Sequence, residues 1–145
     1  MDEGLNLRRD DNTLENKEKL KKRILVADDD ESTLYLLIEF ISEFGYDVVA
    51  VKNGKELLDK LIDSKEKFDA ILSDNNMPKM NGIDVLEQIR KNPEFKTIPF
   101  ILQTGATDSK LDRRVKELDG RYLEKPSSFK DIRKILKEEL EEKDE

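Results

Sequence analysis

Residues 68–78 read FDAILSDNNMP, a short apolar run that ends in a carboxylate, two asparagines and a Met-Pro pair. A short apolar run bounded by turn-forming residues is typical of a strand that is covered on both faces of a sheet. Asp74 comes at the end of this predicted strand, where the sheet meets the loops. Its carboxylate is the best candidate in the chain for reactive chemistry.

Similar apolar runs alternate with amphipathic stretches from Arg23 onward, which is the pattern of repeated strand–helix units in a parallel sheet. Five strands are expected, at residues 23–28, 47–51, 69–74, 98–103 and 121–124. Five helices are expected between and after them, because leucine, isoleucine and valine recur at helical spacing, as at Leu34, Leu37 and Ile41. The predicted fold class is therefore α/β, with a doubly wound sheet.

The composition excludes several classes of chemistry. The chain has 145 residues, enough for one domain with its own core, and it contains neither cysteine nor histidine. Disulfide frameworks, thiolate nucleophiles, Cys/His zinc sites and imidazole bases are therefore ruled out. A net charge of -7 argues against direct binding to nucleic acid or to anionic membranes. A soluble, cytoplasmic protein is expected, since neither a spanning run nor a secretion signal is evident.

Three segments are predicted along the chain. Residues 1–21 carry only scattered leucines among charges and asparagines, so a flexible charged arm is expected there. Residues 22–142 form the predicted domain, and residues 143–145 an acidic tail.

A second acidic strand end is expected beside Asp74. The predicted strand at 23–28 runs into Asp28, Asp29 and Asp30, and parallel sheets bring the carboxyl ends of neighbouring strands together. Carboxylates that meet there predict a Mg²⁺ site made by Asp28 or Asp29, by Asp74 and by one backbone carbonyl, which Asn76 is well placed to supply, with waters completing the shell. Asp30 is expected to begin a helix, where the dipole favours an anion.

The fourth and fifth predicted strands bring two further polar groups to the same edge. Thr104 offers a hydroxyl donor and is followed by the small residues Gly105 and Ala106. Lys125 offers a positive charge and is followed by Pro126. A carboxylate beside a divalent cation can accept a phosphoryl group, and these two side chains are placed to contact that group.

The four motifs together resemble the response-regulator receiver domain of bacterial two-component signalling, of the chemotaxis-type single-domain form. They are the acidic pair Asp28-Asp29, D-x-N-M-P from Asp74 with Gly82 beyond it, T-G-A from Thr104, and K-P from Lys125. The resemblance covers about residues 23 to 140. It implies a flavodoxin-like sheet of five parallel strands in the order 2-1-3-4-5, covered by five helices.

The resemblance also implies a function. Asp74 takes a phosphoryl group from a histidine kinase or a histidine phosphotransfer protein with Mg²⁺, Thr104 and Lys125 contact the phosphate, and Tyr122 acts with Thr104 as a switch. The surface of the fourth helix, fifth strand and fifth helix then changes its affinity for a downstream protein. Such a domain loses its own phosphoryl group slowly and is not a turnover enzyme. Asn75 departs from the family, which more often has an apolar residue there.

Other functions fit the sequence less well than a receiver domain does. An EF-hand loop is excluded, because its glycine is missing at the sixth position of a loop that starts at either Asp74 or Asp28, and a loop that starts at Asp74 also lacks the glutamate at the twelfth. No nucleotide-binding glycine motif is present. A phosphatase with a strand-end aspartate nucleophile would need a second aspartate where Asn76 stands. The main alternative is a receiver-like interaction module that works without phosphorylation.

Overall fold

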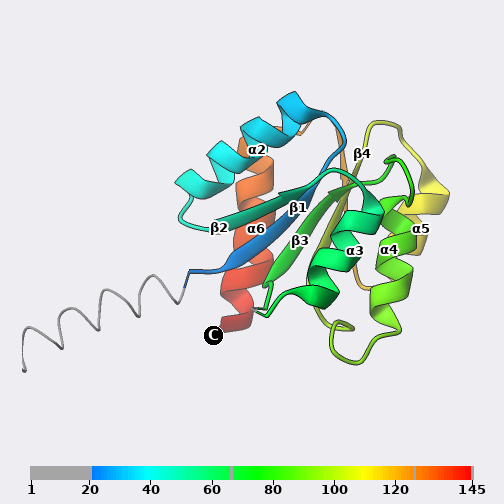
Figure 1. The fold of residues 1–145 in the computed structure, drawn as a ribbon. Helices are drawn as coiled ribbons and strands as arrows, with labels where there is room; N and C mark the ends of the chain where they lie inside the picture. The colour runs from blue at the N-terminus through cyan, green and yellow to red at the C-terminus, as the bar shows by residue number, and fades with distance from the viewer. Residues whose placement is uncertain (1–20, 66, 126, 145) are drawn as a thin grey trace, which may run out of the picture.

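The computed structural model describes residues 21–65, 67–125 and 127–144, with side chains described as far as Leu140. Strands and helices alternate along this part of the chain (Figure 1). In order they are β1 Arg23–Ala27, α2 Glu31–Glu43, β2 Asp47–Val51, α3 Gly54–Asp63, β3 Ala70–Asp74, α4 Gly82–Arg90, β4 Phe100–Thr104, α5 Ser109–Glu117, β5 Arg121–Glu124 and α6 Phe129–Asp144.

The strands form one parallel sheet in the order β2-β1-β3-β4-β5, which confirms the predicted fold. Leu25 of β1 lies between Val49 of β2 and Ile71 of β3. Because all the strands are parallel, their carboxyl ends share one edge of the sheet. That edge carries Asp28, Asp74, Thr104 and Lys125, each at or just after the end of a strand.

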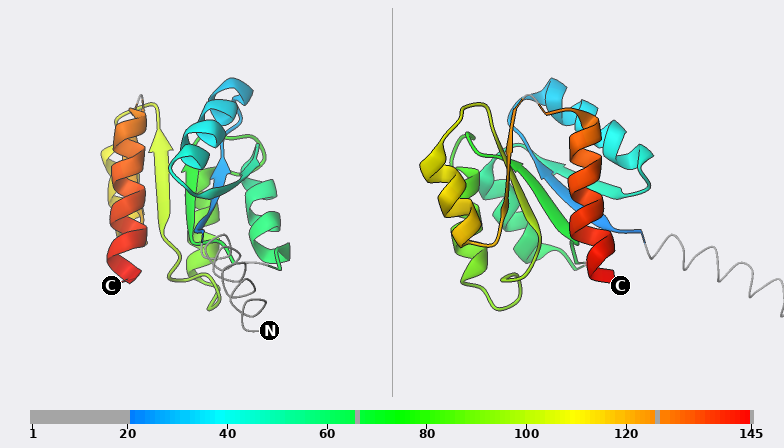
Figure 2. Two further views of the ribbon diagram at one scale, coloured as in Figure 1. Left: turned by 90° about the vertical axis from the view of Figure 1, so that its left-hand side faces the viewer. Right: turned by 180° about the vertical axis from the view of Figure 1, so that it is seen from behind.

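Helices cover both faces of the sheet. Helices α2 and α6 pack on one face and α3, α4 and α5 on the other, as Figures 1 and 2 show. Successive side chains of a strand point to opposite faces, so β1 contributes Leu25 to one core and Ile24 and Val26 to the other. This two-sided burial explains why the strand sequences are continuously apolar.

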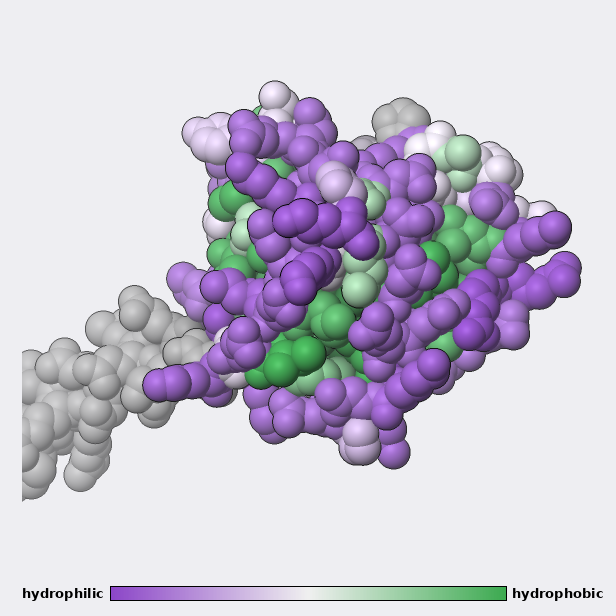
Figure 3. Space-filling view, turned by 45° about the vertical axis from the view of Figure 1, so that its right-hand side comes forward, coloured by the Kyte–Doolittle hydropathy of each residue, from purple (hydrophilic) through white to green (hydrophobic). Residues whose placement is uncertain are grey.

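The molecular surface is mostly polar. In the view of Figure 3, hydrophilic side chains predominate, and apolar atoms show mainly in the hollows between them. Among the residues whose side chains the structure describes, three large apolar ones are nevertheless exposed, Tyr35 and Leu36 on α2 and Ile62 on α3.

The helix start expected at Asp30 is confirmed, and side chains also cap the starts of two other helices. Asp30 caps α2 by accepting a hydrogen bond from the Thr33 N–H at 3.0 Å. Asn53 caps α3 by accepting from the Glu56 N–H at 2.8 Å, and Ser128 accepts from the Asp131 N–H at 3.1 Å at the start of α6. Local sequence alone carries these signals, because each cap and its donor are close neighbours in the chain.

Several predicted boundaries were wrong by one or two residues. The clearest is the fourth strand, expected at 98–103, which begins at Phe100 and includes Thr104 as its last residue. Pro99 has no N–H for the ladder, although its carbonyl accepts from Ile71 at 2.9 Å. Thr104 thus belongs to the strand and does not follow it. The predicted arm, apart from Lys21, and Pro126 of the K-P motif lie outside the described residues.

Candidate functional site

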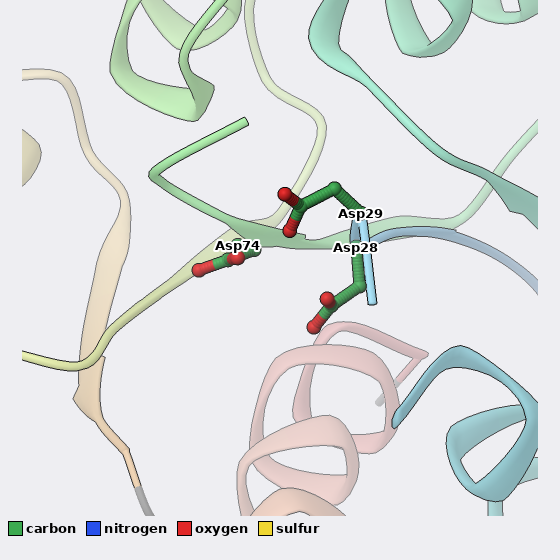
Figure 4. Close-up of side chains that lie close together, drawn as sticks. All are labelled: Asp28, Asp29 and Asp74. Carbon is green, nitrogen blue, oxygen red and sulfur yellow. The ribbon is translucent and has the colours of Figure 1, made fainter. Parts of the chain in front are cut away.

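Three carboxylates meet at the carboxyl edge of the sheet. Ligand atoms of Asp28, Asp29 and Asp74 all lie within 4.8 Å of one another. Figure 4 shows that Asp28 and Asp29 come from the end of β1 and Asp74 from the neighbouring β3. Asp28 and Asp74 are buried, whereas Asp29 is exposed and leaves the cluster open to solvent.

Lys125 supplies the positive charge of the cluster. Its Nζ lies 2.9 Å from Oδ2 of Asp28 and 3.5 Å from Oδ1 of Asp74. Burial disfavours the charged ammonium, but the hydrogen bond and charge of Asp28 and the charge of Asp74 outweigh it and raise the pKa of Lys125. Lys125 therefore stays protonated at neutral pH and neutralises part of the negative charge.

The surroundings of Asp74 disfavour its negative charge, whereas those of Lys125 favour its positive charge. Burial raises the pKa of its carboxyl group, and the negative charges of Asp28 and Asp29 add to this, while Lys125 opposes it. The carbonyl oxygen of Asp74 accepts a hydrogen bond from Ser73 Oγ at 2.8 Å, which holds the backbone of the residue. A partly desolvated carboxylate is a better nucleophile than a fully hydrated one.

The loop after β3 carries the two asparagines of the motif. Asn76 is exposed. Asn75 is buried, and its backbone N–H donates to the carbonyl of Gln103 on β4 at 2.8 Å. The family resemblance does not explain an asparagine at position 75.

Thr104 and Tyr122 are joined through the loop between β4 and α5. The hydroxyl of Thr104, a buried residue, accepts from the Ala106 N–H at 3.5 Å. The hydroxyl of Tyr122 donates to the Ala106 carbonyl and accepts from the Asp108 N–H, both at 3.1 Å. Thr104 and Tyr122 therefore both bond to the backbone of Ala106.

Gln103 is a polar residue of this edge that the sequence analysis missed. Its side chain is buried and donates to Ser127 Oγ at 2.7 Å, which ties β4 to the segment before α6. A pocket of about 470 Å³ lies beside it between α2 and α6, and Lys125 forms part of its wall. The sequence could have indicated Gln103, because it is a glutamine in an otherwise apolar strand and a buried amide needs a hydrogen-bond partner.

The cluster fits a hard divalent cation. Its donors are carboxylate oxygens alone, and an exposed member leaves room for retained water, which suits Mg²⁺ better than Zn²⁺. Its three carboxylates outnumber the one ammonium, so a net negative charge remains for a cation to neutralise.

The response regulator receiver domain family matches residues 24–137, which is most of the chain and includes all of these side chains. The chain belongs to this family. Receiver domains bind Mg²⁺ at an acidic pocket, which in this chain is the cluster of Asp28, Asp29 and Asp74. They are signalling proteins and not turnover enzymes.

Individual relatives agree with this membership. The chemotaxis protein CheY1 of Helicobacter pylori is 31% identical over 121 residues, which cover 82% of this chain and 94% of that protein. The alkaline phosphatase synthesis transcriptional regulatory protein PhoP of Bacillus subtilis is 36% identical, over 81% of this chain and 48% of the regulator. The 3',5'-cyclic-nucleotide phosphodiesterase regA of Dictyostelium discoideum is 34% identical, over 80% of this chain but only 15% of the phosphodiesterase.

Solved structures show the same fold in receiver proteins. The chemotaxis response regulator CheY4 of Vibrio cholerae superimposes with a TM-score of 0.75 at 27% identity, over 83% of this chain and 99% of that chain. A CheY-like receiver domain protein from Methanospirillum hungatei gives a TM-score of 0.76 at 28% identity, over 86% of this chain and 97% of that chain. Among the described residues, no helix has the length and apolar character needed to cross a bilayer.

Proposed function

We propose that this receiver domain is a phosphoacceptor, and that it takes a phosphoryl group on Asp74 from a histidine kinase or a histidine phosphotransfer protein. The observation that carries the proposal is the meeting of Asp28, Asp29 and Asp74 within 4.8 Å, with Lys125 between two of them. In this proposal the domain spans residues 22–142, residues 1–21 form a charged arm and residues 143–145 an acidic tail.

The proposed reaction is a single transfer. An ionised oxygen of Asp74 attacks the phosphorus of a phosphohistidine, and an acyl phosphate forms as the N–P bond breaks. The electron pair of that bond goes to the imidazole nitrogen of the donor, which recovers a neutral ring on taking up a proton. Because Asp74 lies at the end of β3 on a packed sheet, its carboxylate is held in place before the donor arrives.

Asp28, Asp29, Asp74 and the Asn76 carbonyl are the groups that would hold Mg²⁺. When bound, Mg²⁺ neutralises phosphoryl oxygens and so lets two anions approach each other. Lys125 would pair with the transferred phosphoryl group, since its Nζ is already 3.5 Å from the Asp74 carboxylate. The Thr104 hydroxyl would donate to another phosphoryl oxygen.

The proposed output follows from the link between Thr104 and Tyr122. A phosphoryl group on Asp74 would draw the Thr104 hydroxyl toward it and shift the loop at Ala106, to which the Tyr122 hydroxyl is bonded. The surface of α5, β5 and α6 would then change its affinity for a downstream protein. Phosphorylation acts here as a covalent anion that favours one of two arrangements.

Labelling by a small acyl phosphate tests the proposal. Radiolabelled acetyl phosphate with Mg²⁺ is expected to label the protein, and EDTA is expected to prevent it. Asp74→Asn should not be labelled, whereas Asp84→Asn, which removes an exposed carboxylate from α4, should be labelled normally. Label that persists in Asp74→Asn would place the phosphoacceptor at another residue.

Amide spectra with beryllofluoride and Mg²⁺ provide a second test. Shifts are expected around Asp74, Thr104 and Tyr122. An unchanged spectrum, together with no labelling, would favour the alternative of an interaction module that works without phosphorylation. Repeated turnover of unrelated phosphomonoesters would instead favour a phosphatase.

A further inference from the structure

Asn75, which directly follows Asp74, is buried and all of its polar groups have partners. Its exposed fraction is 8%, which is unusual for asparagine. Its N–H donates to the Gln103 carbonyl at 2.8 Å and its own carbonyl accepts from the Gly82 N–H at 2.9 Å. Its side-chain Oδ1 accepts from the Ile83 N–H at 3.0 Å, and Nδ2 donates to Oδ1 of Asn76 at 3.4 Å.

These bonds replace a missing cap on α4. Asn81 occupies the N-cap position of α4, yet its side chain makes no capping hydrogen bond. With its amide oriented to suit its neighbours, Asn81 instead donates to the carbonyls of Asn75 at 3.3 Å and Met77 at 3.2 Å. The first N–H groups of a helix lack partners within the helix. Asn75 therefore satisfies those of Gly82 and Ile83 from outside the helix, eight residues before Ile83.

The same contact brings the start of α4 against the backbone of the phosphoacceptor. A Cβ atom built on Gly82 would lie 2.6 Å from the carbonyl oxygen of Asp74. The two peptide units on either side of Asn75 are thus held by β4 and by α4, and its side chain also bonds to Ile83 and to the Asn76 side chain.

We propose that Asn75 is a positioning residue that clamps Asp74 and the Asn76 carbonyl to the start of α4. This inference rests on the proposed phosphoacceptor function. Small displacements of reacting groups reduce transfer rates by large factors, and loss of groups that orient metal ligands weakens metal binding. The clamp acts through Asp74 and Asn76 and makes no contact with the phosphoryl group in this proposal.

Asn53 offers a matched control. It is also a buried asparagine, 7% exposed, and its side chain also caps a helix, accepting from the Glu56 N–H at 2.8 Å. It is not adjacent to Asp74 in the chain. Asn53→Ala and Asn75→Ala therefore remove similar caps, and only the second is expected to disturb the phosphoacceptor.

Two measurements compare these variants. Labelling by acetyl phosphate is followed across Mg²⁺ concentrations, and Mg²⁺ binding is followed separately by amide chemical shifts. For Asn75→Ala, the maximal labelling rate should fall and the Mg²⁺ concentration at half-saturation should rise, each about tenfold, while Asn53→Ala should stay within about twofold of the unsubstituted protein. Hydrogen exchange at the Ile83 amide should accelerate only in Asn75→Ala.

Different results would overturn the proposed role of Asn75 and the proposed phosphoacceptor function. Unchanged labelling and unchanged Mg²⁺ binding in Asn75→Ala would overturn the clamp, as would equal effects in Asn53→Ala. No labelling of the unsubstituted protein would overturn the phosphoacceptor function, and the Mg²⁺ titration would still test the clamp. Asn75→Leu, which fills the buried space with an apolar side chain, repeats the comparison if Asn75→Ala does not fold.

Discussion

Lys125 is the residue on which the charge balance of the site depends. One ammonium group is shared between Asp28 and Asp74, and it lies closer to Asp28, which has an exposed fraction of only 1%. A buried carboxylate that loses its counter-charge is strongly destabilising. The lysine therefore has a stabilising role in addition to its proposed contact with phosphate.

Lys125→Ala is expected to lower the free energy of unfolding by about 2 kcal/mol in EDTA, less than for a fully buried pair because its side chain is partly exposed. Excess Mg²⁺ should recover most of this loss by neutralising the same carboxylates. Urea unfolding with and without Mg²⁺ measures both effects.

The control is Lys52→Ala, which removes an ion pair of 2.6 Å to Glu31 between exposed side chains. It should change the free energy of unfolding far less than Lys125→Ala does, because water and salt screen an exposed ion pair, and Mg²⁺ should recover nothing. Equal losses in the two variants would contradict the role given to Lys125.

Asp74→Asn is expected to stabilise the fold at neutral pH by roughly 1 kcal/mol, as replacements at functional sites often do. Burial raises the pKa of Asp74, so the folded protein holds its proton more tightly than the unfolded chain does. The carboxyl group thus favours folding at a pH below its ordinary pKa, and this contribution is lost as the pH rises through the raised pKa. The advantage of asparagine should accordingly shrink in acid. Urea unfolding of both proteins in EDTA, from neutral pH into acid, measures this difference in the free energy of unfolding. A stability advantage of Asp74→Asn that grows in acid would contradict the prediction.

At the level of elements, α4 is held differently from α2, α3 and α5. Those three helices are capped by Asp30, Asn53 and Asp108, each acting on the turn that follows it. Helix α4 depends on Asn75, which belongs to the preceding loop. The position of α4 and the backbone of the phosphoacceptor are consequently linked.

Gly82→Ala should disturb this link. A Cβ atom there would lie 2.6 Å from the Asp74 carbonyl oxygen and 2.7 Å from Leu102 Cδ1, so α4 must move away. We expect a loss of about 2 kcal/mol in the free energy of unfolding and slower labelling of Asp74. Gly105→Ala is the control for stability, because a Cβ at Gly105 meets nothing within 4 Å. The link would be contradicted if both substitutions left stability and labelling unchanged.

The boundaries of a helix or strand could be predicted from the sequence only where the residues that form them are close neighbours in the chain. Asp30 was expected from the sequence to begin a helix, and its capping partner Thr33 lies within one helical turn. The start of β4 was placed too early, because Ile98 and Pro99 continue the apolar pattern although the ladder begins at Phe100. The role of Asn75 could not be foreseen, since its partner Ile83 is eight residues away.

At the scale of the whole molecule, the site is assembled from distant parts of the chain. Lys125 and Asp28 are 97 residues apart in sequence and 2.9 Å apart in space. Asp28 and Asp74 stand on adjacent strands because β1 pairs with β3 in the sheet. A ligand that binds this cluster therefore holds several elements together and should stabilise the entire fold.

Mg²⁺ is expected to raise the free energy of unfolding by about 1.4 kcal/mol at a concentration about ten times its dissociation constant. The reason is that the carboxylates converge only in the folded state. Thermal unfolding with Mg²⁺ or EDTA measures the effect. Asp29→Asn, which removes the exposed carboxylate of the cluster, should greatly reduce it. Equal stabilisation of this variant would indicate that Mg²⁺ acts elsewhere.

The sequence was sufficient for the α/β class, the approximate strands and the strand-end residues Asp74, Asp29, Thr104 and Lys125, because apolar periodicity and short motifs are local properties. Tertiary structure alone decided which oxygens Lys125 contacts, how Tyr122 is bonded to the loop after Thr104, and that Asn75 caps α4. The physical reason is that hydrogen bonds and ion pairs depend on distances of a few ångströms between residues that only folding brings together.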